Sequence, residues 1–162
     1  MKTLIIYDSA YGNTEKIAQS VASAIRNDGE VKVLRVSEVT HDRISGIDLL
    51  VVGSPTQRFR ATPDLSEFLK QMPDHALDGI GVATFDTRFT EEKIKDTSRV
   101  LKFFVGVFGY AAKPIAEQLV AKGGHLVLPP EGFYVNDTEG PLLEGELQRA
   151  EAWGQLLVTK SK

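Results

Sequence analysis

The stretch TLIIYDSAYGNTEKIAQSVASAI (residues 3–25) predicts a strand, a loop and a helix in one run. Thr3 to Tyr7 is an apolar run of strand length, and apolar residues recur at helical spacing from Ile17 to Ile25. One glycine, Gly12, and small polar side chains lie between them. The stretch therefore predicts the first half of a βαβ unit.

The same alternation continues along the chain. Apolar runs predict strands at 3–7, 31–36, 48–53, 80–85 and 125–128, and helical patterns follow at about 64–71, 114–122 and 143–158. Continuous apolar runs are typical of parallel strands that are covered on both faces. The sequence therefore predicts an α/β fold with a three-layer, doubly wound, five-stranded parallel sheet, and we expect residues 1–162 to form a single domain.

Composition excludes several classes of function. The chain has 162 residues, with 19 basic and 22 acidic side chains, and it has no block of like charge that would favour nucleic acid as a partner. It has no cysteine, which excludes disulfides, iron–sulfur ligation and thiol nucleophiles. No apolar run reaches the roughly 18 to 20 residues of a transmembrane segment, so we expect a cytoplasmic protein.

No set of residues indicates a metal or a dedicated catalytic group. The three histidines, His41, His75 and His125, are scattered without ligand spacing. No nucleophile, acid or base stands out either, so we expect any redox chemistry to come from a bound cofactor.

The loop from Ser9 to Thr14 enters a helix N-terminus, where unpaired backbone N–H groups favour an anion. Gly12 permits a tight turn, and the loop has no lysine or arginine, so a phosphate would be held by hydrogen bonds alone. The spacing excludes both G-x-x-x-x-G-K-[ST] and G-x-G-x-x-G. The alternative is a plain helix cap, with Thr14 or Asn13 as the capping residue.

The loop SAYGNT (9–14) is similar to the [ST]-x-T-G-x-T motif of the flavodoxin family, and VVGSPT (51–56) and GPLLEGEL (140–147) extend the resemblance. The resemblance implies the strand order 2-1-3-4-5 and a flavin mononucleotide (FMN). It places the phosphate against Ser9, Tyr11, Gly12, Asn13 and Thr14. One ring face would lie against Pro55, Thr56, Gln57, Arg58 and Phe59, and the other against Thr84, Phe85, Asp86, Thr87, Arg88 and Phe89.

Aromatic side chains suit the ring, because flat apolar surfaces stack on it and exclude water. Phe59, Phe85 and Phe89 are the candidates. Ordinary packing is the alternative for each of them, and it is favoured for Phe85 because this residue ends a predicted strand.

Three departures from the family pattern have consequences. Tyr11 replaces a small hydroxyl residue. The loop 54–63 has no glycine, so a left-handed residue there would cost roughly 1 kcal/mol, and we expect weak stabilisation of the one-electron-reduced flavin. Arg58, Arg60 and Arg88 accompany a single acid, Asp86, which predicts a less negative potential unless these arginines pair with carboxylates.

Residues 87–112 exceed what one crossover connection needs. Within them, RVLKFFVGVFGY (99–110) is strongly apolar. It is either packed on the domain or forms a docking surface or lid for a partner, a quinone or a membrane.

The sequence thus favours an FMN-binding electron-transfer protein with a redox protein or a small-molecule acceptor as its partner. Two alternatives remain open. One is an FMN-dependent oxidoreductase that reduces a quinone or another small acceptor. The other is an interaction module of the same fold without a cofactor.

Overall fold

A parallel β-sheet forms the centre of the protein, whose computed structural model describes residues 1–58, 60–97 and 110–162. The strands are β1 (Lys2–Tyr7), β2 (Glu30–Arg35), β3 (Leu49–Pro55), β4 (Gly81–Phe89), β5 (His125–Leu126) and β6 (Glu131–Val135). They lie in the order β2-β1-β3-β4-β5, with β6 also paired to β4. The doubly wound sheet and the order 2-1-3-4-5 are confirmed.

The fifth position of the sheet holds two short strands instead of the single predicted strand at 125–128. His125 and Leu126 pair with the start of β4, and Glu131–Val135 pairs with its end. Pro129 and Pro130 separate the two strands, and proline has no N–H to donate to a ladder. The sequence prediction missed the return of the chain to β4 after these prolines.

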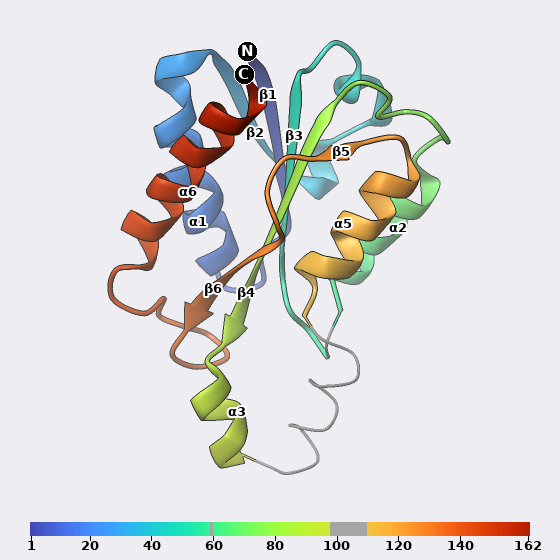
Figure 1. The fold of residues 1–162 in the computed structure, drawn as a ribbon. Coiled ribbons are helices and arrows are strands. Elements are labelled where there is room, and N and C mark those ends of the chain that lie inside the picture. Colours follow the sequence, from blue (N-terminus) through green and yellow to red (C-terminus); the bar gives the residue numbers. More distant parts are fainter. Residues whose placement is uncertain (59, 98–109) are drawn as a thin grey trace.

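Helices cover both faces of the sheet. α1 (Asn13–Ile25) and α6 (Glu146–Ser161) lie on one face, and α2 (Pro63–Gln71) and α5 (Ala112–Ala121) lie on the other (Figure 1). α3 (Glu91–Thr97) follows the carboxyl end of β4. Short 3₁₀ helices span Arg26–Asp28, Val36–Glu38 and His41–Ile44. The three layers agree with the sequence prediction.

Alternate residues of β1 supply the two halves of the core. Leu4 and Ile6 pack with side chains of α2 and α5, and Ile5 packs with side chains of α1 and α6. Trp153 of α6 lies in the second half and is 5% exposed. Burial of such side chains stabilises the fold by about 1.5–3 kcal/mol each.

The fourth strand is longer than the sequence suggested. We expected it to end at Phe85, but β4 continues through Phe89. Thr84, Phe85 and Asp86 are therefore residues of a buried strand and not of a loop. The carboxyl ends of β1, β3 and β4 meet at one edge of the sheet, where a doubly wound fold binds its ligands.

Candidate functional site

A cavity of about 400 Å³ lies at this edge, within the range of small-molecule sites. All three segments that the resemblance places against the flavin contribute to it. The predicted residues in its lining are Ser9, Tyr11, Asn13, Thr14, Pro55, Thr56, Gln57, Arg58, Thr87, Arg88 and Phe89. Sequence reasoning missed the remaining lining residues, Ala10, Ile94, Tyr110, Val135 and Thr138.

Other predicted residues lie elsewhere. Phe85 is fully buried and makes edge-to-face contacts with Phe133 and Trp153, so it packs in the core and does not line the cavity. Thr84 and Asp86 are buried behind the wall, and Gly12 forms the turn before α1. Phe59 lies outside the described residues. Phe89 alone of the three predicted ring-stacking candidates is seen in the lining.

The first loop presents backbone donors to the cavity. Gly12 adopts φ +85 and directly precedes α1, where no side chain caps the helix. Asn13 and Thr14 are already helical, so the plain helix cap with either residue as N-cap is wrong. The N–H groups of Asn13, Thr14 and Glu15 have no intrahelical acceptor at this position. The Ala10 and Tyr11 N–H groups have no partner among the described residues, which leaves a set of donors suited to an anion.

Side chains of this loop fix its position. Thr14 and Thr87 share a buried hydrogen bond between their hydroxyl oxygens, 2.8 Å apart. Asn13 donates from its Nδ2 to the Glu139 carbonyl oxygen at 3.1 Å. A Cβ on Gly140 would come within 2.7 Å of Asn13 Oδ1. The third sequence motif thus packs directly against the first loop.

One arginine reaches this loop from another strand. Arg35 at the end of β2 forms an ion pair with Asp8, with 3.2 Å between Nη2 and Oδ1, and it also donates to the Ser9 carbonyl oxygen. The expectation that no basic side chain takes part in this loop is therefore incomplete. The loop itself has no basic residue, but the fold places Arg35 against it, outside the lining of the cavity.

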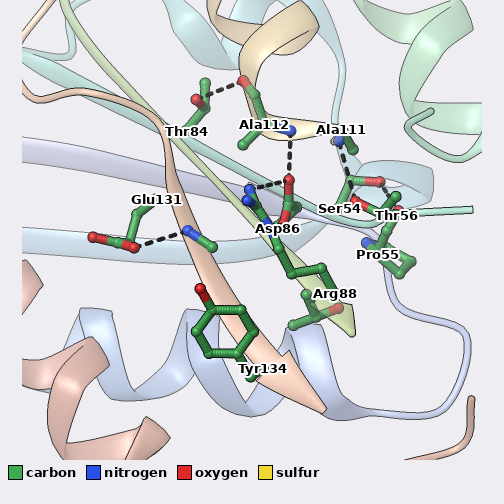
Figure 2. A network of polar contacts seen from close by, with 12 residues as sticks. Ser54, Pro55, Thr56, Thr84, Asp86, Arg88, Ala111, Ala112, Glu131 and Tyr134 are labelled. Atoms are coloured by element: carbon green, nitrogen blue, oxygen red, sulfur yellow. Dashed lines mark hydrogen bonds and ion pairs between the residues drawn. The ribbon is translucent and has the colours of Figure 1, made fainter. Parts of the chain in front are cut away.

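The opposite wall of the cavity contains a buried polar network, which Figure 2 shows. Asp86 accepts hydrogen bonds from Arg88 Nε at 2.5 Å, Arg88 Nη2 at 2.8 Å and the Ala112 N–H at 2.8 Å. Thr84 donates to the Ala112 carbonyl oxygen, and Thr56 accepts from the Ala111 N–H. The network fixes the start of α5 against β4 and the loop after β3.

The charges in this network compensate one another. Burial raises the pKa of Asp86 above its ordinary value, and the Arg88 guanidinium and the Ala112 N–H oppose that rise. Arg88 also lies over the ring of Tyr110, with its Cζ 3.8 Å from the ring centroid. Burial raises the pKa of Tyr110 as well. We expected Arg88 either to present its charge to the ring or to pair with a carboxylate. In the structure it pairs with the buried carboxylate of Asp86.

The glycine-free loop contains a left-handed residue nonetheless. Gln57 and Arg60 exchange two backbone hydrogen bonds of 2.9 Å, and Arg58 between them has φ +47. A non-glycine residue in this region carries a cost of about 1–2 kcal/mol. Arg58 therefore already has the left-handed conformation that we expected to be costly in a loop without glycine.

Tyr110 is a wall residue that the sequence pattern did not single out. It belongs to the predicted docking segment 99–110, of which residues 99–109 lie outside the described part of the chain. Its apolar neighbours in the sequence suggested packing or docking and gave no signal for a place in the cavity. Its contact with Arg88 could not be predicted, because the two residues are far apart in the sequence.

Within residues 1–58, 60–97 and 110–162, no three His, Cys, Asp or Glu side chains are grouped as metal ligands. None of the helices in those ranges has the length and apolar character needed to cross a membrane.

Comparison with known proteins gives consistent matches. A family model described as "Flavodoxin domain" matches residues 4–126. The chain is 37% identical over 111 residues to an uncharacterized protein of Methanocaldococcus jannaschii, a match that covers 63% of this chain and 28% of that protein. It is 46% identical over 57 residues to a flavodoxin of Aquifex aeolicus, covering 34% of this chain and 31% of that protein. The match thus spans less than a third of either curated relative.

The fold is similar to that of a solved flavodoxin. Oxidised Flavodoxin 1 from Bacillus cereus aligns with a TM-score of 0.77 and 21% identity, over 98% of both chains. At this identity the likeness concerns the fold alone.

Proposed function

Because this chain belongs to the flavodoxin family, we propose that it binds FMN in the cavity at the carboxyl edge of the sheet and acts as an electron-transfer protein. The flavin would supply the redox chemistry by accepting and releasing electrons. The protein would bind it, orient it and exclude water from its ring.

The unpaired backbone N–H groups at the start of α1 carry this proposal. Thr14 is 1% exposed and Asn13 is 7% exposed, and a buried N–H group is normally hydrogen-bonded. A phosphate at this point would accept from these donors, and the positive end of the helix dipole would favour it. The remaining cavity is walled by Pro55, Phe89 and Tyr110, whose apolar and aromatic surfaces suit a flavin ring.

Titration of the purified protein with FMN tests the proposal. We expect a bound flavin spectrum with one equivalent of FMN and reversible bleaching on stepwise anaerobic reduction. If added FMN keeps the spectrum of free FMN and separates from the protein on a desalting column, the proposal is contradicted. That result would support the alternative of a module without cofactor.

Two glycines provide a matched pair of variants. Gly12 has φ +85 and Gly79 has φ +78, and a Cβ would meet no atom within 4 Å at either position. Gly12→Ala and Gly79→Ala therefore impose a similar backbone strain of about 1–2 kcal/mol. Only Gly12→Ala should weaken FMN binding, because Gly79 precedes β4 at the opposite end of the sheet.

The runner-up is an FMN-dependent oxidoreductase that reduces a quinone or another small acceptor. Ile94 and Tyr110, from the segment beyond β4, extend the apolar wall of the cavity, which favours an organic acceptor near the ring. Steady oxidation of a nicotinamide donor that requires both FMN and a quinone would favour this function. Reduction of a protein partner, without such nicotinamide oxidation, would favour the electron carrier.

The donor, the acceptor, the cytoplasmic location and the single domain remain predictions. An arginine attracts an anionic acceptor or partner surface only if its own charge is not compensated. Asp86 compensates the charge of Arg88.

A further inference from the structure

We propose that Arg35, acting through Asp8 and Ser9, is a positioning residue that turns the backbone of the first loop toward the flavin phosphate. The inference rests on the proposed FMN function and deepens it. It assigns to the Asp8–Arg35 pair the preference of the site for the phosphorylated flavin over riboflavin.

The contacts fix both backbone polar groups of Ser9. One carboxylate oxygen, Asp8 Oδ1, accepts from the Ser9 N–H at 2.8 Å and from Arg35 Nε at 3.3 Å and Nη2 at 3.2 Å. The same Nη2 donates to the Ser9 carbonyl oxygen. Asp8 is itself anchored, because its N–H donates to the Gly53 carbonyl oxygen at 3.1 Å. Ser9 is therefore held from two sides, by Asp8, which is anchored to β3, and by Arg35 of β2.

Peptide geometry converts this hold into an orientation of donors. The Ser9–Ala10 peptide is planar and trans, so its carbonyl oxygen and the Ala10 N–H point in opposite directions. Arg35 holds the carbonyl and does not itself line the cavity. The Ala10 N–H is thereby directed to the side of the loop away from Arg35.

Ser9 passes the constraint on to the helix start. Its Oγ accepts from the Gly12 N–H at 2.9 Å, so neither the Ser9 nor the Gly12 N–H remains for a ligand. The Ser9 hydroxyl keeps its own proton to donate. Gly12 is the residue from which α1 starts, with its free N–H groups at Asn13, Thr14 and Glu15. A displacement of Ser9 would therefore displace the whole set of donors.

Charge attraction alone does not account for this arrangement. The Arg35 side chain is 43% exposed, and an ion pair at such a position contributes little to stability. A guanidinium, unlike an ammonium, can engage a carboxylate and a carbonyl at once with fixed geometry. The alternative is that the pair only fastens β2 to β1 at the edge of the sheet.

Affinities for FMN and riboflavin distinguish these interpretations. Arg35→Ala should weaken FMN binding about tenfold or more. This is the loss expected when a backbone N–H of the loop no longer donates a charge-assisted hydrogen bond to the phosphate. Riboflavin has no phosphate, so its dissociation constant should change less than about twofold under the same change. Asp8→Asn should show the same selectivity. Equal weakening of both ligands, or no change for FMN, would overturn the proposal.

Lys32→Ala is the matched control. Lys32 lies on the same strand and pairs with Glu30 at 3.2 Å, with 61% of its side chain exposed, and it does not line the cavity. It should alter neither affinity.

Amide hydrogen exchange of the ligand-free protein tests the positioning without FMN. We expect the Ser9 and Gly12 amides to be protected in the wild type and in Lys32→Ala, and to exchange about tenfold faster in Arg35→Ala. Unchanged protection in Arg35→Ala would overturn the positioning role. If the wild type fails to bind FMN, the proposed function fails, and the exchange measurement still decides whether Arg35 positions the loop.

Discussion

Two aspartate–arginine pairs flank the same cavity, and they differ in almost every other respect. Asp8 and Arg35 are 27 residues apart; Asp8 directly follows β1, and Arg35 ends the neighbouring strand β2. Asp86 and Arg88 are two residues apart on β4. The Arg35 side chain is 43% exposed, whereas Arg88 is 17% exposed and Asp86 is fully buried.

This difference separates two uses of the same chemistry. The half-exposed pair carries little energy of its own, but it fixes the backbone of the loop that would hold a phosphate. The buried pair holds the wall of the cavity together, and it cancels a positive charge that the sequence alone would have assigned to the ring. Burial determines how much each pair costs to break, because an uncompensated charge in the interior has lost its solvation.

Arg88→Ala should have the largest effect. It leaves the buried Asp86 carboxylate without its main counter-charge, and we expect a loss of about 3–5 kcal/mol in the free energy of unfolding near neutral pH. Urea denaturation measures this loss. Arg60→Ala, at an exposed position in the loop after β3, is the control and should stay within about 0.5 kcal/mol of the wild type.

The loss should depend on pH with a definite sign. Burial raises the pKa of Asp86 in the folded state, so its contribution to stability falls as the pH rises from about 4 through its native pKa. Without Arg88 that pKa rises further. The deficit of Arg88→Ala should therefore be smallest near pH 4 and grow toward neutral pH. A deficit that stays constant from pH 4 to 8 would contradict this origin.

Gly132→Ala should have an intermediate effect. A Cβ at Gly132 would lie 2.3 Å from Arg88 Nε and 2.4 Å from Cζ, so the guanidinium must move from Asp86. We expect a loss of about 1–3 kcal/mol, as for an overpacked site. In an Arg88→Ala background the same substitution should add much less, because the atoms that it meets are gone. Urea denaturation of both single variants and the double variant measures the coupling.

Arg35→Ala should have the smallest effect on stability. The pair is half-exposed, and we expect the free energy of unfolding to fall by no more than about 1 kcal/mol, close to the value for Lys32→Ala. A loss as large as that of Arg88→Ala would remove the contrast between the two pairs. Thermal or urea unfolding of the ligand-free protein is the measurement.

The sequence predicted much of the fold because its signals are local. The apolar runs of β1, β3 and β4 and the helical spacing in α1 and α6 each depend on neighbouring residues. The split fifth strand was missed because pairing of β6 with β4 is a long-range choice, and the prolines before it are typical of a loop. The start of β4 was predicted. Its last four residues were not, because they are in the strand through the same pairing with β6.

The candidate site shows the same division. The loop from Ser9 to Thr14 was predicted from a strand end and a glycine, and the segments at the ends of β3 and β4 followed from the resemblance. Residues of all three line the cavity. The resemblance placed Phe85 against the ring, whereas its position at a strand end favoured ordinary packing, and it does pack in the core against Trp153. Tyr110 was missed because nothing near it in the sequence points to Arg88.

The amino-acid sequence by itself determined the class of fold, most of the strands and helices and the loop that contains Gly12, because periodicity and turn chemistry act over a few residues. Only the tertiary structure decided what the arginines do. An arginine on β2 reaches the first loop, and an arginine on β4 turns back onto a buried aspartate instead of toward the ring. A side-chain charge acts on whatever the fold brings within a few ångströms, and that distance cannot be derived from separation along the chain.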